Sequence, residues 1–297
     1  MARTTVADIR TRAGGGRTHT PHGRPRSVNG HGPPVTRADI GGLGNILGIW
    51  AHPDDESYLS TGTMMAAKAA GSRVAVVTAT YGELGVPPGS AIDPSRMAEI
   101  RRGEMRRAMD RIGVDEHYWL ELPDGGCHLV PRGGPVAAIG RVIETFRPDT
   151  VLAFGPDGMT GHADHKATSR WATAAVGATT TPGHPIQLLY ATSLPGWMEA
   201  HVQPDLREPI YGPSGPPRTP AEDLAFDLPL GEALLDAKMD VMAAHASQTS
   251  TVIDLFGAEQ YRRWISREVF RAPTTAELWA NGNRAPGHRP LRAHVAV

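Results

Sequence analysis

The chain has one cysteine and no long hydrophobic run, and both absences narrow its class. Cys127 stands alone among 297 residues, so no intrachain disulfide can form, which fits a reducing compartment. No apolar stretch approaches the roughly 18 residues that cross a bilayer, and the first residues lack the apolar segment of a signal peptide. The formal net charge of −1 provides no general attraction to nucleic acid or to an anionic membrane. We therefore expect a cytoplasmic protein that binds neither.

Two common catalytic signatures are also missing. The sequence contains neither the G-x-S-x-G turn of serine hydrolases nor the G-x-x-x-x-G-K-[ST] phosphate loop. Hydrophobic residues at 40% and charged residues at 21% are typical of a globular protein, and thirteen histidines are a mild enrichment. Histidine is both a metal ligand and a proton carrier, so its positions indicate where chemistry is to be sought.

Three segments differ in composition. Residues 1–40 are basic and rich in Gly, Pro, Arg and His, which predicts a disordered tail. Residues 41–272 alternate apolar runs with amphipathic stretches, although 203–230 is Pro-rich and aperiodic and is predicted to be a surface excursion. Residues 273–297 are predicted to be a C-terminal loop and tail.

The alternation within the main domain predicts an α/β fold. Strands are expected at 45–51, 72–80, 116–122, 149–155 and 186–193, and helices at 61–71, 93–114, 135–147, 162–178 and 231–248. This order implies a Rossmann-like, mainly parallel sheet with helices on both faces, in a single domain with a C-terminal addition.

Polar clusters follow three of these strands. They are HPDDE at 52–56, YGELG at 81–85 and GPDGMTGHADH at 155–165. Because the carboxyl ends of parallel strands lie at one edge of the sheet, we expect the clusters to meet there. His52, Asp55 and His165 would then supply two imidazoles and one carboxylate, the donor set of an open catalytic metal site.

The neighbouring polar residues have two readings each. Asp54 could take a proton from a metal-bound water, or it could cap the following helix. His162 could stabilise an oxyanion or protonate a leaving amine, with Asp164 holding it as an imidazolium. Alternatively, His162 and Asp164 cap the helix that starts near His165. The residues alone leave these alternatives open.

Four motifs resemble one known family. AHPDDE, IRRGE at 100–104, LPDG at 122–125 and GHADH at 161–165 are similar to the PIG-L/LmbE-like zinc-dependent deacetylases, over about residues 46–250. The resemblance implies hydrolysis of a linear amide on an N-acetylglucosamine-type or related N-acyl amino sugar. It extends to AHASQ at 244–248.

The resemblance also assigns roles residue by residue. It implies that His52, Asp55 and His165 bind zinc, with ferrous iron as the other candidate. Asp54 becomes the general base, and His162 the oxyanion stabiliser or general acid with Asp164 as its partner. The expected substrate-binding residues are Arg101, Asp124, Glu83 and His245.

Three other functions compete with this hypothesis. They are a mycothiol-conjugate-type amidase, a non-haem iron oxygenase with the same two-His, one-carboxylate set, and a non-catalytic sugar-binding protein. The α/β alternation disfavours the oxygenase, and the presence of both Asp54 and His162 disfavours a binding protein. The expected partner is a small amino-sugar substrate, and the oligomeric state, homo-oligomer included, stays open.

Overall fold

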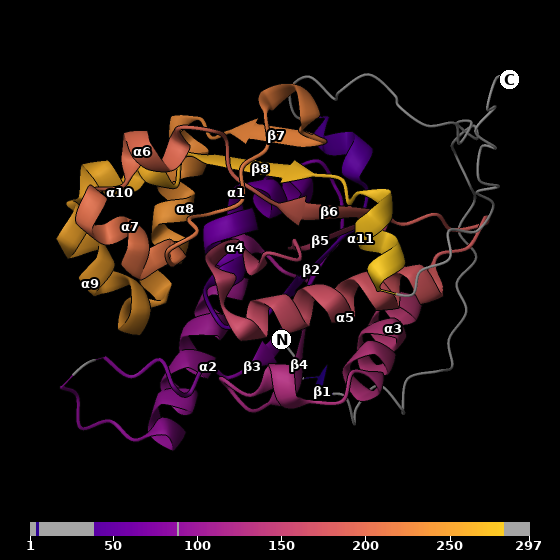
Figure 1. Ribbon diagram of the computed structural model, residues 1–297, viewed down its shortest axis with the longest axis horizontal. Helices are drawn as coiled ribbons and strands as arrows, with labels where there is room; N and C mark the ends of the chain where they lie inside the picture. Colours follow the sequence, from indigo (N-terminus) through magenta and orange to yellow (C-terminus); the bar gives the residue numbers. More distant parts are fainter. Residues whose placement is uncertain (1–3, 6–38, 88, 282–297) are drawn as a thin grey trace, which may run out of the picture.

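The computed structural model describes residues 4–5, 39–87 and 89–281 and is built on one sheet (Figure 1). Its eight strands have the order β1-β4-β3-β2-β5-β6-β8-β7. The five central strands run parallel: β4 (Glu116–Leu122), β3 (Val74–Thr80), β2 (Ile46–Trp50), β5 (Thr150–Phe154) and β6 (Gln187–Ala191). The predicted mainly parallel α/β fold is confirmed.

Helices cover both faces of this sheet. Along β2, Leu47 and Ile49 point into one core and Ile46 and Trp50 into the other, as the two-residue period of a strand requires. The helices of the first core are α3 (Gly133–Phe146) and α5 (Ala163–Thr179). Those of the second are α1 (Asp55–Ala69), α2 (Pro94–Ile112) and α8 (Glu232–Ala244). Figure 1 shows α3 and α5 together on one side of the strands.

The C-terminal part differs from the prediction. Residues 203–230 are not an aperiodic excursion: they contain α7 (Pro204–Tyr211) and β7 (Phe226–Pro229). β7 pairs antiparallel with β8 (Arg267–Arg271), and β8 pairs antiparallel with β6. Arg267 and Asp227 pair across these strands, with Nε 2.7 Å from Oδ1. Two short strands forty residues apart carry too little periodicity to be found in the sequence.

Short helices complete the fold. α6 (Trp197–His201), α9 (Ala246–Phe256) and α10 (Ala258–Trp264) gather with α7 at one end of the molecule, on the left of Figure 1. α11 (Thr275–Ala280) lies within the predicted C-terminal tail. A capping box of Thr274 and Glu277 starts it, and Glu277 also binds Arg271 at 2.7 Å.

Most of the predicted N-terminal tail lies outside the described residues. Within it, Thr4–Thr5 form β1, which pairs with β4, and a short 3₁₀ helix, η2 (Ile40–Leu43), follows at its end. Across the described ranges, no helix is both long and apolar enough to cross a membrane.

Candidate active site

The turn between β2 and α1 holds Asp54 in an unusual conformation. Its φ of 110° is rare for a residue with a side chain, and such strain clusters at functional sites. Asp54 occupies the N-cap position of α1, but its carboxylate makes no capping hydrogen bond. The backbone oxygen of Asp54 accepts from Ser57 and Tyr58 instead. The carboxylate is therefore available for chemistry, and the helix-cap alternative does not describe it.

Arg101 of α2 holds this turn in place through hydrogen bonds. Its guanidinium donates to the backbone oxygens of Pro53 and Gly82 and lies 3.2 Å from Asp54 Oδ2. Only 4% of Arg101 is exposed. A Cβ at Gly82 would lie 2.2 Å from Arg101 Nη1, so the close approach requires glycine there. Arg101 thus positions Asp54. Direct contact between Arg101 and the substrate remains a prediction.

The three predicted metal ligands come together. His52 Nδ1 lies 3.0 Å from His165 Nε2 and 3.6 Å from Asp55 Oδ2, and His165 Nε2 lies 3.4 Å from Asp55 Oδ1. Donors at about 2.1 Å from a tetrahedral ion stand about 3.4 Å from one another. The two imidazole nitrogens stand near this spacing. Asp55 approaches them with different oxygens, Oδ1 toward His165 and Oδ2 toward His52, and Oδ2 also accepts from the backbone N–H groups of Ala51 and His52.

Each imidazole has a partner on its other nitrogen. His165 Nδ1 lies 2.9 Å from the carbonyl oxygen of Gly158, and a φ of +73° turns that glycine toward it. His52 Nε2 lies 3.1 Å from Asp124 Oδ1 and 3.5 Å from Asp164 Oδ2, within ion-pair distance although not aligned as hydrogen bonds. Ligating histidines commonly have such partners, which fix ring orientation.

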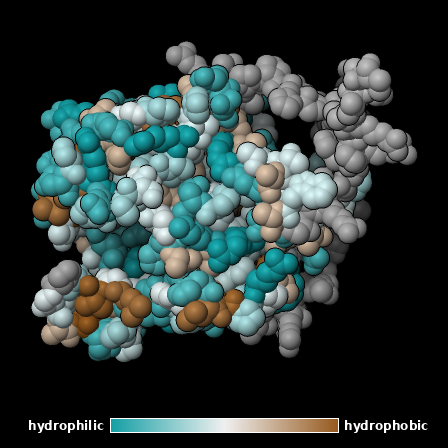
Figure 2. Space-filling view, in the orientation of Figure 1, coloured by the Kyte–Doolittle hydropathy of each residue, from teal (hydrophilic) through white to brown (hydrophobic). Residues whose placement is uncertain are grey.

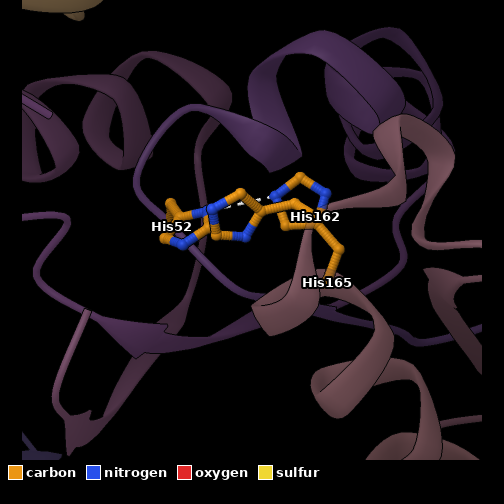
Figure 3. Close-up of side chains that lie close together, drawn as sticks. All are labelled: His52, His162 and His165. Atoms are coloured by element: carbon orange, nitrogen blue, oxygen red, sulfur yellow. Dashed lines mark hydrogen bonds between the residues drawn. The ribbon is translucent and has the colours of Figure 1, made fainter. Parts of the chain in front are cut away.

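His162 stands beside these two rings (Figure 3). Its ring centroid is 4.9 Å from that of His52 and 5.1 Å from that of His165. The nitrogens of these three residues are close enough to form an alternative donor group, as are the donor atoms of His52, Asp124 and Asp164. His162 is exposed, and its Nδ1 accepts from the backbone N–H of Asp164 at 3.2 Å. His162 therefore does cap α5, one of the two readings left open.

The partnership expected between Asp164 and His162 is not the one found. The buried Asp164 carboxylate accepts from the backbone N–H groups of Gly125 at 2.7 Å and Cys127 at 3.0 Å, and it faces His52. Burial and the charge of His52 lower the pKa of His162, which disfavours the imidazolium that was expected there. Asp164 orients the loop after β4 and His52 instead.

Glu83 and Asp124 link the loops after β3 and β4 at the edge of the site. Asp124 N donates to Glu83 Oε1 at 2.9 Å, and Leu84 N donates to Asp124 Oδ2 at 2.8 Å. The side chains on these loops include two exposed leucines: Leu84 is 58% exposed, and Leu129, five residues after Asp124, is 76% exposed. Figure 2 shows a largely hydrophilic face with hydrophobic side chains gathered along its lower edge, where Figure 1 places the loop before α2.

The assignment of His245 to substrate binding is wrong for this conformation. His245 has no exposed surface, and its Nε2 lies 3.1 Å from Glu56 Oε1 and 3.1 Å from Ser57 Oγ. Glu56 Oε2 in turn accepts from the backbone N–H of Asp54 at 3.1 Å. His245 and Glu56 therefore support the Asp54 turn from within the protein.

Charge and burial tune the groups at the centre. Burial, partly offset by Arg101, raises the pKa of Asp54 to about 6. Burial acts against a charge on His52, but Asp124, Asp164 and Asp55 outweigh it and raise the pKa of His52 to about 10. Burial acts against ionisation of Asp124, but contact with His52 lowers its pKa to about 2. Perturbed groups of this kind are typical of functional sites.

A cavity of about 260 Å³ adjoins the donor cluster of His52, Asp55 and His165, and no pattern in the sequence indicates it. Asp54, Asp55 and His165 form one side of it. The opposite side is largely apolar and comes from α6, α7, α9 and α10: Trp197, Ile210, Tyr211, Val252 and Trp264. These residues have no common spacing in the sequence, so only the fold brings them together.

Comparison with known proteins agrees with this geometry. Residues 47–176 match the family described as PIG-L, GlcNAc-PI de-N-acetylase. A 1D-myo-inositol 2-acetamido-2-deoxy-alpha-D-glucopyranoside deacetylase of Kineococcus radiotolerans is 37% identical over 40% of this chain and 41% of its own. A protein of the same name from Segniliparus rotundus is 29% identical over 70% of this chain and 78% of its own. The chain thus aligns with less than half of the first relative.

Solved structures share the fold. The N,N'-diacetylchitobiose deacetylase of Pyrococcus horikoshii has a TM-score of 0.52 and 21% identity, over 77% of this chain and 83% of its own. GalB, the 4-carboxy-2-hydroxymuconate hydratase of Pseudomonas putida, has a TM-score of 0.54 and 15% identity, over 78% and 97%. One fold thus serves different reactions, so the reaction must be argued from the site. Residues 47–176 and the motifs within them are thus similar to the PIG-L family, and the fold is that of its solved relatives.

Proposed function

We propose that this protein is a metal-dependent hydrolase that removes the acyl group from an N-acetylglucosamine-type amino sugar. The observation that carries the proposal is the cluster of His52, Asp55 and His165, with donor atoms 3.0–3.6 Å apart, next to the carboxylate of Asp54, which Arg101 holds and which does not cap α1. The names of the relatives, deacetylases of 2-acetamido sugars, support the reaction and the substrate class. Zinc is the proposed ion because two imidazoles and one carboxylate form a known catalytic zinc set.

The chain's own residues account for the proton movements. A divalent ion, when bound, polarises the acyl carbonyl and acidifies a water molecule. Asp54, held by Arg101, takes the proton from the attacking water and returns it to the nitrogen of the leaving amine. His162 Nδ1 accepts from Asp164 N, which leaves the ring proton on Nε2. A neutral His162 can therefore donate a hydrogen bond to the developing oxyanion without being an imidazolium.

We propose that the polar rim, formed by Glu83, Asp124 and Arg101, orients the substrate. Glu83 and Asp124 hold the loops after β3 and β4 together, and Arg101 holds the turn after β2. We place the sugar hydroxyls against this rim, where carboxylate and backbone groups can accept and donate hydrogen bonds. A cytoplasmic location completes the proposal.

A substrate screen tests the proposal. Purified protein, stripped of metal and then reloaded with Zn²⁺ or Fe²⁺, is incubated with an inositol-linked N-acetylglucosaminide, a malate-linked one and diacetylchitobiose. We expect metal-dependent release of primary amine and an equal amount of acetate from at least one of them. Absence of amine release from every substrate with either metal would contradict the proposed reaction.

A further inference from the structure

The cavity beside the donor cluster has a wall of aromatic and aliphatic side chains. Tyr58 of α1, Trp197 of α6, Tyr211 of α7, Val252 of α9 and Trp264 of α10 line it. The rings pack on one another, with centroids of Tyr58 and Trp264 5.5 Å apart. Figure 1 shows these C-terminal helices assembled at one end of the sheet. Apart from Tyr58, the residues of this wall come from the C-terminal part, beyond the segment that matches the family, residues 47–176.

The polar atoms in this wall are already bound to protein. Trp264 Nε1 donates to Tyr211 Oη at 3.0 Å, and Trp197 Nε1 donates to the Trp264 carbonyl at 3.1 Å. Arg267 is paired with Asp227, as described above, and Glu268 is paired with Lys238 at 2.7 Å. A ligand in this cavity thus meets mainly apolar surface, which favours an apolar group.

The donor cluster also has polar neighbours that do not line the cavity. His162 and Asp124 adjoin His52, and Asp124 N donates to Glu83 between the loops after β3 and β4. Asp55 and His165 line the cavity, whereas His52 does not line it and contacts Asp124. A substrate whose amide carbon sits at the donor cluster therefore has one end in a polar environment and the other in an apolar one.

We infer that the substrate carries an N-acyl group larger than acetyl and that this group occupies the apolar cavity. The inference rests on the proposed function and specifies its substrate: the sugar binds the polar rim, and the hydrocarbon chain of the acyl group extends between Tyr58, Val252 and Trp264. Hydrolysis adds water across the C–N bond, giving a free carboxylic acid and a free amine. Val252, Trp197 and Trp264 set the accepted chain length.

The size of the cavity supports a chain of several carbons. A cavity of roughly 150 Å³ is enough for a benzene molecule, and this one measures about 260 Å³. The methyl group of an acetamide would leave most of that volume unfilled by substrate. Each additional buried methylene should improve binding roughly fourfold.

The test compares acyl chains on one sugar. Zinc-loaded protein is assayed with methyl glucosaminides bearing N-acetyl, N-butyryl, N-hexanoyl and N-octanoyl groups, and with octyl N-acetylglucosaminide. We expect kcat/KM to rise at least tenfold from acetyl to hexanoyl. An equal or greater value for acetyl overturns the inference while leaving the proposed reaction intact. A gain only with the octyl aglycone also overturns it, because the apolar group then lies on the sugar side.

A filling substitution and a binding measurement make the test independent of turnover. Val252→Phe narrows the cavity and should lower the hexanoyl-to-acetyl ratio at least fivefold, whereas Leu255→Phe, on the same helix but 59% exposed, should not change it. Calorimetry should show octanoate binding zinc-loaded wild-type protein at least tenfold more tightly than acetate, and Val252→Phe should abolish the difference. Equal affinities for octanoate and acetate overturn the inference, whether or not any substrate is turned over. Absence of turnover with every substrate overturns the proposed function instead.

Discussion

The carboxylate of Asp54 is held by Arg101 at the edge of the donor cluster and is free of any capping role. Asp54→Asn should therefore lower kcat by about 10²–10⁴-fold, the usual loss when a general base is removed, and should leave the metal content unchanged. Steady-state amine release and elemental analysis of the same samples measure the two effects.

Asp93 offers a matched control for that substitution. It caps α2 by accepting from Arg96 N at 3.0 Å, a role that asparagine also fills. Asp93→Asn should keep kcat within about twofold of wild type, because Asp93 lies on the surface. An Asp54→Asn enzyme with wild-type kcat would remove Asp54 from the mechanism.

Asp124 should affect metal affinity more than chain stability. It is the nearest carboxylate to His52 Nε2, and loss of such a partner typically weakens metal binding by about 10–100-fold. A competition titration with a chromogenic chelator should show this loss for Asp124→Asn and none for Asp110→Asn on the exposed face of α2. Equal metal affinity in wild type and Asp124→Asn would show that His52 does not depend on Asp124.

The contacts of single residues could be predicted where the partners lie close together in the sequence. His52 and Asp55 are three residues apart on one turn, so their meeting follows from local geometry. Asp164 and His245 were misassigned because their roles depend on partners 37 to 189 residues away: Cys127 for Asp164, and Glu56 for His245. Sequence alone does not show that a histidine is fully buried.

Elements α1, α8 and β8 meet at a buried ion pair. Lys238 Nζ lies 2.7 Å from Glu268 Oε1, and Glu268 also accepts from the backbone N–H groups of Gly62 and Thr63. Lys238→Met would leave a buried carboxylate without its cation, so unfolding free energy should fall by about 3–5 kcal/mol. Urea denaturation measures it. The double variant Lys238→Met/Glu268→Gln should recover part of the loss, and no recovery would show that packing of Lys238 matters more than charge.

His117 on β4 should make stability fall in mild acid. Burial lowers its pKa to about 4, against about 6.5 in an unfolded chain. Between these values the unfolded chain takes up a proton that the folded protein does not, so stability is complete above pH 6.5 and declines as pH falls toward 4. The ring keeps some exposed surface, which moderates the effect.

The variant His117→Gln should flatten this part of the pH profile. Glutamine can still bond the hydroxyl of Thr78, which lies 3.0 Å from His117 Nε2, and it does not titrate. Melting temperatures of both proteins between pH 7 and pH 4 provide the comparison. Parallel curves for the two proteins would assign the acid sensitivity to other groups.

Elements with strong periodicity or clear caps were predicted well. β4 was expected at 116–122 and spans Glu116–Leu122, and α2 begins at Pro94 and ends before Gly113 as the cap signals indicate. β7 and β8 were missed because four- and five-residue strands flanked by Pro and charged residues lack a readable pattern. Their pairing depends on contacts with β6, which no local signal shows.

At the scale of the whole molecule, the parallel strand order explains the site. The loops after β2, β3, β4 and β5 meet at one edge of the sheet, so residues a hundred positions apart become neighbours. The fold class follows from alternation alone. The apolar cavity does not, because α6, α7, α9 and α10 assemble it from surfaces that are only partly buried.

If His52, Asp55 and His165 hold the metal on which amide hydrolysis depends, metal occupancy and hydrolysis must change together in a metal titration. Zn²⁺ is added stepwise to metal-free protein, and bound metal and amine release are measured in each sample. The rate should rise with occupancy and level off at about one ion per chain, and His165→Ala should lose both the metal and the activity. Full occupancy in His165→Ala, or hydrolysis undiminished in the metal-free protein, would contradict it.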